Sequence, residues 1–165
     1  MKEINISIAG LGNVGSHLVN TIEKNKDIVD FKSNIKFNIV GISAKNKNKK
    51  RIFNTLNYNW YDNPKNLLNI KNLDVFIELI GQEKGISFDL VKYALENKIH
   101  VVTANKALIA KNGSELFGIA EKNNVLLLYE AAVAGGIPII KMLKNNIFLN
   151  NIKKISGILN GTTNF

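Results

Sequence analysis

At 165 residues, with 45% hydrophobic and 21% charged side chains, the chain has the composition of a folded domain, which excludes a disordered or fibrous protein. It contains no cysteine, which excludes disulfides, thiolate metal sites and cysteine nucleophiles. Its formal net charge of +9 could attract nucleic acid, but the lysines are scattered and lack interleaved aromatic residues, so we predict solvated basic faces and no nucleic-acid partner.

The first predicted strand covers residues 4–9. Its isoleucines recur at every second position, the run ends at Gly10, and apolar residues then recur at helical spacing over 14–22. The strand contains Asn5 and Ser7, which distinguishes it from the apolar core of a signal peptide. Because no apolar run reaches the roughly 18 residues that a membrane helix needs, we expect a cytoplasmic protein with no membrane partner.

Apolar runs and helical patterns continue to alternate along the chain. Further strands are predicted at residues 37–42, 74–80, 99–103 and 125–129. Helices are predicted at 87–97, with Ser87 as the cap, and at 106–122, with a break at Asn112-Gly113. Strands joined through helices imply right-handed crossovers, so we predict a doubly wound α/β fold with a mostly parallel sheet.

The character of the sequence changes after Glu130. Ala134-Gly135-Gly136 leads into a predicted helix at 137–147 and a predicted strand at 152–159. We place a domain boundary there. Residues 1–134 then form the α/β domain, and residues 135–165 begin a second, α+β domain.

Residues 10–15 form a G-x-G-x-x-G pattern between the first strand and the first helix. Gly10 permits a tight turn, Gly12 lets the backbone approach a pyrophosphate, and Gly15 lets the helix pack on the strand. A purely structural turn is the alternative, but the position between strand and helix favours a Rossmann-like dinucleotide site, with phosphates at the helix amides. The predicted site comprises Gly10, Leu11, Gly12, Asn13, Val14 and Gly15.

The residues after the second strand bear on the choice of cofactor. An acidic residue there binds the ribose hydroxyls of NAD, whereas NADP needs positive charge. The stretch 43–51 contains lysines and Arg51 but no carboxylate. We therefore predict NADP, with NAD as the alternative, and place Lys45 beside the 2′-phosphate, with Arg51 or another lysine as a second contact. A solvated basic loop is the other interpretation.

A lysine lies just beyond the strand predicted at 99–103. Ligands bind at the carboxyl ends of strands in an open parallel sheet. Lys106 could there orient a substrate oxygen and stabilise the charge that develops on it during hydride transfer. Taken alone, a lysine at a helix start is more often an ordinary surface residue.

The sequence segments GLGNVG at 10–15, VTANK at 102–106, EAAVAGGIP at 130–138 and GILNGTTN at 157–164 occur in this order. Together they resemble the successive motifs of the homoserine dehydrogenase family, over essentially the whole chain. The resemblance implies reversible, NAD(P)-dependent interconversion of L-homoserine and L-aspartate 4-semialdehyde, on the route to threonine, methionine and isoleucine. It makes residues 1–134 the NAD(P)-binding domain and residues 135–165 the start of the substrate domain.

The resemblance also implies how the active site is built. Lys106 matches the family lysine that lies where nicotinamide and substrate meet, and Thr103 and Asn105 help to form that edge. Gly161 and Thr162 match the loop that contacts the amino-acid substrate. Lys106 is thus the candidate catalytic residue, and Lys106 and Thr103 are candidate cofactor contacts.

The resemblance further implies a site for a monovalent cation, commonly sodium. Glu130 matches the carboxylate of that site, and the backbone carbonyls of Val133, Gly135 and Ile137 match the other ligands. Oxygen ligands suit a hard cation. The alternative for Glu130 is a carboxylate that caps a helix.

The sequence ends at Phe165, directly after the last motif. In the family, the part that follows supplies further substrate-binding groups and the sheet of a homodimer. We expect this polypeptide to bind cofactor but to be inactive alone, because hydride transfer needs both reactants held by a complete pocket. The alternatives are a noncatalytic nucleotide-binding domain and a reductase for a different aldehyde or imine.

Overall fold

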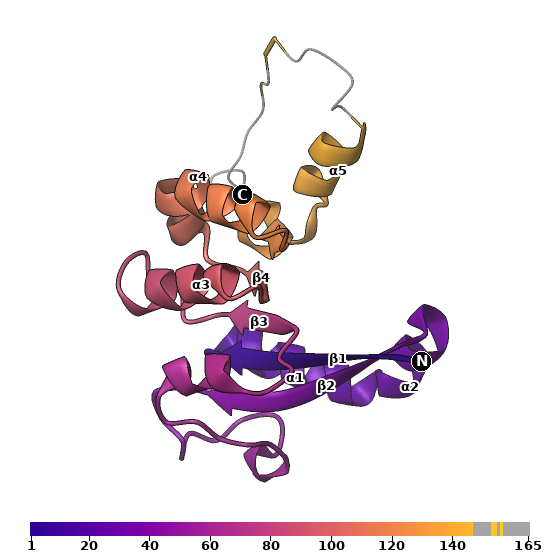
Figure 1. Ribbon diagram of the computed structural model, residues 1–165. Coiled ribbons are helices and arrows are strands. Elements are labelled where there is room, and N and C mark those ends of the chain that lie inside the picture. The colour runs from indigo at the N-terminus through magenta and orange to yellow at the C-terminus, as the bar shows by residue number, and fades with distance from the viewer. Residues whose placement is uncertain (147–152, 155, 157–165) are drawn as a thin grey trace, which may run out of the picture.

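The computed structural model describes residues 1–146, 153–154 and 156. Its centre is a five-stranded sheet in the order β2-β1-β3-β4-β5, and every neighbouring pair is parallel. The strands are β1 (Lys2–Ala9), β2 (Ile35–Ser43), β3 (Val75–Glu78), β4 (His100–Thr103) and β5 (Leu127–Leu128). The chain passes from β1 to β2 on one side and returns to β3 on the other, so the predicted doubly wound α/β fold is confirmed (Figure 1).

Helices follow most strands and cover the sheet. They are α1 (Asn13–Lys24), α2 (Lys26–Ser33), α3 (Ile86–Glu96), α4 (Lys106–Lys122) and α5 (Ile139–Asn146). Short 3₁₀ helices cover Thr55–Asn57, Pro64–Asn69, Glu130–Ala132 and Ala134–Gly136. α3 and α4 pack side by side (Figure 1). None of the helices within the described ranges is long and apolar enough to span a bilayer.

The two faces of the sheet bury separate apolar cores. Phe76 and Ile77 are adjacent in β3 and therefore point to opposite faces. Phe76 belongs to the core that includes Leu90 of α3 and Leu116 of α4, whereas Ile77 belongs to the core that includes Val19 of α1. α1 thus covers one face and the α3–α4 pair covers the other, which is the layered arrangement of a doubly wound sheet.

The structure corrects two local predictions. Ser87 is not the cap of its helix: the cap is Gly85, and Ser87 is the second residue of α3 with a fully buried side chain. The helix predicted to break at Asn112-Gly113 is continuous through α4, because Gly113 is buried and lies next to the ring of Phe117. Packing outweighs the low helix propensity of glycine at this position.

The described residues include only part of the predicted second domain. β5 is shorter than the strand predicted at 125–129, and α5 begins at Ile139, two positions after the start predicted at 137. The strand predicted at 152–159 lies outside the described residues. The boundary at residue 134 therefore stays a prediction.

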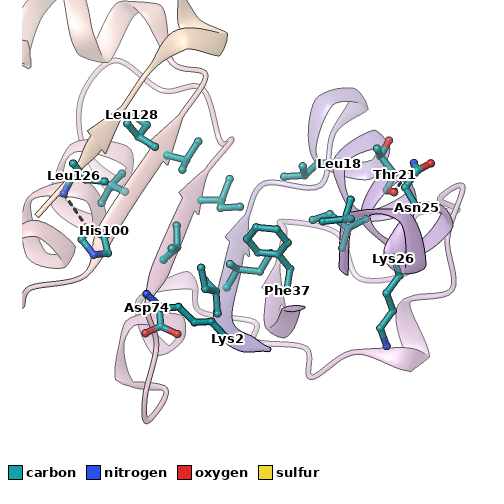
Figure 2. Close-up of a pocket in the computed structure, with 18 of the residues that line it drawn as sticks. Lys2, Leu18, Thr21, Asn25, Lys26, Phe37, Asp74, His100, Leu126 and Leu128 are labelled. Atoms are coloured by element: carbon teal, nitrogen blue, oxygen red, sulfur yellow. Dashed lines mark hydrogen bonds between the residues drawn. The ribbon is translucent and has the colours of Figure 1, made fainter. Parts of the chain in front are cut away.

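An apolar cavity of about 560 Å³ lies on the α1 side of the sheet. Figure 2 shows Phe37 and Leu18 on one side of it and Leu126 and Leu128 on the other. Leu126 and Leu128 are exposed, so the cavity is open where the sheet extends beyond α1 toward β5. None of its lining residues belongs to the glycine turn at 10–15, so this cavity is distinct from the predicted nucleotide site.

Candidate functional site

The glycine turn, residues 10–15, joins β1 to α1. Gly10 has a φ of +101°, and a Cβ there would lie 2.3 Å from the carbonyl carbon and oxygen of Leu79 at the end of β3. A Cβ on Gly15 would lie 2.0 Å from the carbonyl oxygen of Gly10. A Cβ on Gly12 would meet nothing within 4 Å. The steric roles predicted for Gly10 and Gly15 are confirmed, and Gly12 borders open space.

α1 presents an open amino terminus at this turn. Gly12 is its N-cap, no side chain caps it, and its first turn contains no acidic residue. The N–H of Ser16 makes the first helical bond, to the carbonyl of Gly12 at 2.9 Å. The amides at 13–15 precede that bond and lack partners within the helix. Unpaired amides and the positive end of the helix dipole suit a phosphate.

A cleft of about 930 Å³ opens beyond the carboxyl ends of β1, β2 and β3. Its walls come from the glycine turn, from the basic loop (residues 45–51) that follows β2, and from the segment 79–82 that follows β3. β1 is the strand at which the chain changes direction across the sheet. Open α/β sheets bind their ligands at this switch point.

Positive charge dominates one side of the cleft. Lys45, Lys47, Lys49 and Arg51 line it, and Asp62 is the only carboxylate among its described lining residues. Lys45 is exposed and follows the end of β2 by two positions. The cleft therefore offers an anion both the amides of α1 and the cations of the basic loop.

Arg51 organises the basic loop. Its guanidinium donates to three main-chain carbonyls within that loop, at 2.6, 2.8 and 3.3 Å, and to the carbonyl of Leu11 at 3.4 Å. Burial lowers the pKa of this guanidinium, although arginine remains charged in proteins. Because these donors are engaged, Lys47 and Lys49, which are exposed and line the cleft, are better placed than Arg51 for the predicted second phosphate contact beside Lys45.

A buried carboxylate lies at the carboxyl end of β3, the middle strand of the sheet. Glu78, the last residue of β3, is fully buried. Its Oε1 accepts hydrogen bonds from the amides of Ile80 at 2.9 Å and Gly81 at 3.1 Å and from the hydroxyl of Ser87 at 2.9 Å. Its Oε2 accepts from the hydroxyl of Thr103 at 2.6 Å. Sequence analysis missed Glu78, although an acid inside an apolar run that ends at a ligand-binding edge is a usable signal.

Thr103 continues this network to the start of α4. Its Oγ1 accepts from the amide of Asn105 at 3.0 Å. The side chain of Asn105 caps α4 by accepting from the amide of Leu108 at 3.1 Å, and it donates to the carbonyl of Gln82 at 2.6 Å. Lys106, exposed, is the first residue of α4. The Thr103 hydroxyl is buried and engaged on both sides, so its predicted cofactor contact would have to use the backbone.

Glu130 lies beside the start of α5. Its Oε1 accepts from the amide of Ile140 at 3.0 Å, and its Oε2 accepts from the amide of Lys141 at 2.9 Å. These are the contacts of the helix-capping alternative. The carbonyl of Ile137 accepts from the amide of Ile139 at 2.7 Å, and no three acidic or histidine side chains gather anywhere in the described ranges. The donors thus fit a cation only in part, and its binding there stays a prediction.

The predicted site residues are not all brought together. Gly10, Leu11, Gly12 and Lys45 line the cleft, whereas the other predicted cofactor contacts are not among its lining residues: Asn13, Val14, Gly15, Thr103 and Lys106. Lys106 begins the helix that follows β4, at the same end of the strands. Glu130 belongs to the segment after β5. Gly161 and Thr162, the predicted substrate contacts, lie outside the described residues.

Comparison with known sequences agrees with this geometry. Residues 10–130 match the family described as homoserine dehydrogenase, NAD binding domain. The chain is 41% identical over 165 residues to homoserine dehydrogenase of Neisseria gonorrhoeae, and 39% identical over 172 residues to that of Bacillus subtilis. Each alignment includes 100% of this chain but 38% of the relative, so the chain spans well under half the length of these curated relatives.

Solved structures show the same fold. Homoserine dehydrogenase from Thiobacillus denitrificans aligns with a TM-score of 0.80 and 34% identity, over 91% of this chain and 34% of that one. A hyperthermophilic archaeal homoserine dehydrogenase in complex with NADPH aligns with a TM-score of 0.71 and 25% identity, over 92% of this chain and 51% of that one. The chain therefore belongs to the homoserine dehydrogenase family, and it contains the family's NAD-binding domain.

Proposed function

We propose that the protein is an NADP-dependent homoserine dehydrogenase, to which this chain supplies the cofactor site and the catalytic lysine. The proposal is that it interconverts L-homoserine and L-aspartate 4-semialdehyde. The observation that carries it is one sheet edge that holds both the open amino terminus of α1, with Gly12 bordering free space, and Lys106 at the start of α4. The family membership and the NADPH complex of the archaeal relative support the proposal.

Each part of this edge has a distinct task in the proposal. The amides at the start of α1 bind the diphosphate, with Gly12 allowing close approach. The basic loop binds the 2′-phosphate. When bound, the nicotinamide supplies the hydride acceptor or donor. The Lys106 ammonium orients the substrate oxygen and stabilises the negative charge that develops there as the alcohol is oxidised.

We expect the purified 165-residue polypeptide to bind NADPH but to oxidise homoserine at no detectable rate. The cleft contains the features of the cofactor site, whereas the relatives are more than twice as long as this chain. Hydride transfer depends on holding both reactants in a near-attack geometry. Fluorescence titration with NADPH and a spectrophotometric assay of NADPH formation check the two parts. Homoserine oxidation by the polypeptide alone would contradict the second part, and absence of NADPH binding would contradict the proposed function.

The choice of cofactor is expected to depend on Lys45. We predict that Lys45→Ala weakens NADPH binding about tenfold, equivalent to about 1.4 kcal/mol, because a charge-assisted hydrogen bond to the 2′-phosphate is lost. NADH binding should not change, since NADH has no phosphate at that position. Calorimetric titration of both cofactors measures the preference.

Lys50→Ala is the matched control for this variant. Lys50 belongs to the same loop but does not line the cleft, so its replacement should leave the affinity for NADPH within about twofold. An equal loss in both variants would indicate only the general positive field of the loop. An unchanged preference in Lys45→Ala would remove this residue from the role.

The proposal extends to the assembly and location of the full-length protein. In keeping with the family resemblance, we place it in the cytoplasm as a homodimer. Analytical ultracentrifugation of the full-length protein would show a monomer if the assembly is wrong.

A further inference from the structure

The carboxylate of Glu78 is costly to bury. Its side chain is fully buried, and its hydrogen-bond partners are neutral donors. None of the ion pairs between described residues includes it. A well-packed apolar side chain often serves a fold at least as well as a buried charge. The benefit of Glu78 must therefore lie in what its oxygen atoms hold in place.

The two oxygen atoms of Glu78 hold different parts of the sheet edge. Oε1 fixes the turn after β3 through the amides of Ile80 and Gly81. Ser87 reinforces that turn, because its hydroxyl donates to Oε1 and accepts from the amide of Gln82 at 3.3 Å. Gly81 has a φ of +82°, a backbone conformation that favours glycine. The backbone at Leu79 and Ile80 also contacts the glycine turn, at the site where Gly10 has no Cβ.

Oε2 holds the end of β4. Glu78 and Thr103 are register partners in the β3–β4 ladder, and their side chains meet at 2.6 Å. Thr103 Oγ1 then accepts a hydrogen bond from the amide of Asn105. Asn105 is the residue that caps α4, directly before Lys106. The side chain of Asn105 also bonds to the turn after β3, because its amide group donates a hydrogen bond to the carbonyl of Gln82. The result is a closed ring of contacts between the cleft wall and the start of α4.

We infer that Glu78 is a positioning residue, which locks the turn after β3 to the amino terminus of α4 so that the nicotinamide end of the dinucleotide is held beside Lys106. This inference rests on the proposed function. Glu78 acts through Thr103, Asn105 and the turn, and it need not touch cofactor or substrate. In the proposal the adenine end of the dinucleotide lies at the basic loop, which none of the hydrogen bonds described for Glu78, Thr103 and Asn105 reaches.

Glu78→Gln tests this lock with little change of shape. The glutamine carbonyl can take the place of Oε1 and keep its three donors. Its amide group then takes the place of Oε2, where it can donate to Thr103 but cannot accept the Thr103 hydroxyl. A bond in this direction is neutral and leaves the Thr103 hydroxyl proton without its carboxylate acceptor, so the turn is held to α4 less tightly. If the binding-competent arrangement falls to about a tenth of the population, the apparent affinity for NADPH falls about tenfold.

The measurement compares two ligands of the same 165-residue chain. We expect Glu78→Gln to weaken NADPH binding about tenfold, and to leave the affinity for 2′,5′-ADP, which lacks nicotinamide, within about twofold of wild type. Thr103→Val removes the Glu78–Thr103 bond altogether, together with the acceptor of the Asn105 amide, and should weaken NADPH binding at least as much. The double variant should be no weaker than Thr103→Val alone, because Thr103→Val already removes the interaction that Glu78→Gln weakens. Glu96→Gln, an exposed residue in the last turn of α3, is the charge-matched control.

The outcomes separate this inference from the proposed function. Wild-type chain that binds no NADPH rejects the proposed function, and the inference falls with it. Wild-type binding with unchanged NADPH affinity in both Glu78→Gln and Thr103→Val rejects the inference alone. If Glu78→Gln weakens the binding of NADPH and of 2′,5′-ADP equally, Glu78 stabilises the domain as a whole, and the inference is also overturned. If Glu78→Gln does not fold, Thr103→Val, which retains the carboxylate, gives the same comparison.

Discussion

Gly10→Ala is expected to lower the free energy of unfolding by about 2–5 kcal/mol and to abolish NADPH binding. An alanine at a φ of +101° is strained, and its Cβ would lie 2.3 Å from the backbone of Leu79. Backbone atoms cannot rotate away, so the end of β3 must move from the glycine turn. The loss is a large part of the stability of a domain of this size. Urea unfolding and NADPH titration measure the two effects.

Gly12→Ala separates the binding role from the structural role of the turn. A Cβ on Gly12 meets nothing within 4 Å, so the stability should change by no more than about 0.5 kcal/mol. The same Cβ projects where a diphosphate must approach, so NADPH binding should still be lost. If Gly12→Ala binds NADPH as well as wild type, the diphosphate does not bind at this turn.

Lys106→Met in the full-length protein is expected to lower kcat for homoserine oxidation about 100- to 1000-fold. The ammonium group is proposed to stabilise charge that develops on the substrate oxygen only as the reaction proceeds. Methionine retains much of the length of the side chain without its charge. Steady-state kinetics measure kcat, and thermal unfolding should show little change because Lys106 is exposed.

Lys122→Met provides the control for this substitution. Lys122 is the last residue of α4, at the opposite end of the helix from Lys106. Its replacement should leave kcat unchanged. A kcat within about threefold of wild type for Lys106→Met would assign charge stabilisation to another group, since removal of such a donor ordinarily costs far more.

Local features of the chain were predictable because their causes lie within a few residues. The spacing of the glycines at 10–15 predicts a strand, a tight turn and a helix in succession, whatever the rest of the chain does. Alternation of apolar runs and helical patterns was enough to predict the parallel sheet. The positive charge beside the cleft also follows directly from the lysines after β2.

Long-range contacts decided what the sequence left open. Serine is a common helix cap, but the Ser87 hydroxyl donates a hydrogen bond to the carboxylate of Glu78, nine positions earlier. Arg51 was a candidate phosphate ligand, but its guanidinium bonds to the basic loop and to a carbonyl 40 positions away. In both cases a buried or partly buried polar group takes the partners that the folded chain brings near it.

Sequence by itself determined the succession of the five strands and of α1, α3, α4 and α5 along the chain, the glycine turn and the basic loop, since each depends on residue types at short spacing. Helix α2 was not predicted. Tertiary structure decided the role of Glu78, because only the pairing of β3 with β4 places it opposite Thr103, 25 positions away. No periodicity in the sequence records such a pairing. It arises when two distant strands align and a buried carboxylate must find its hydrogen-bond donors there.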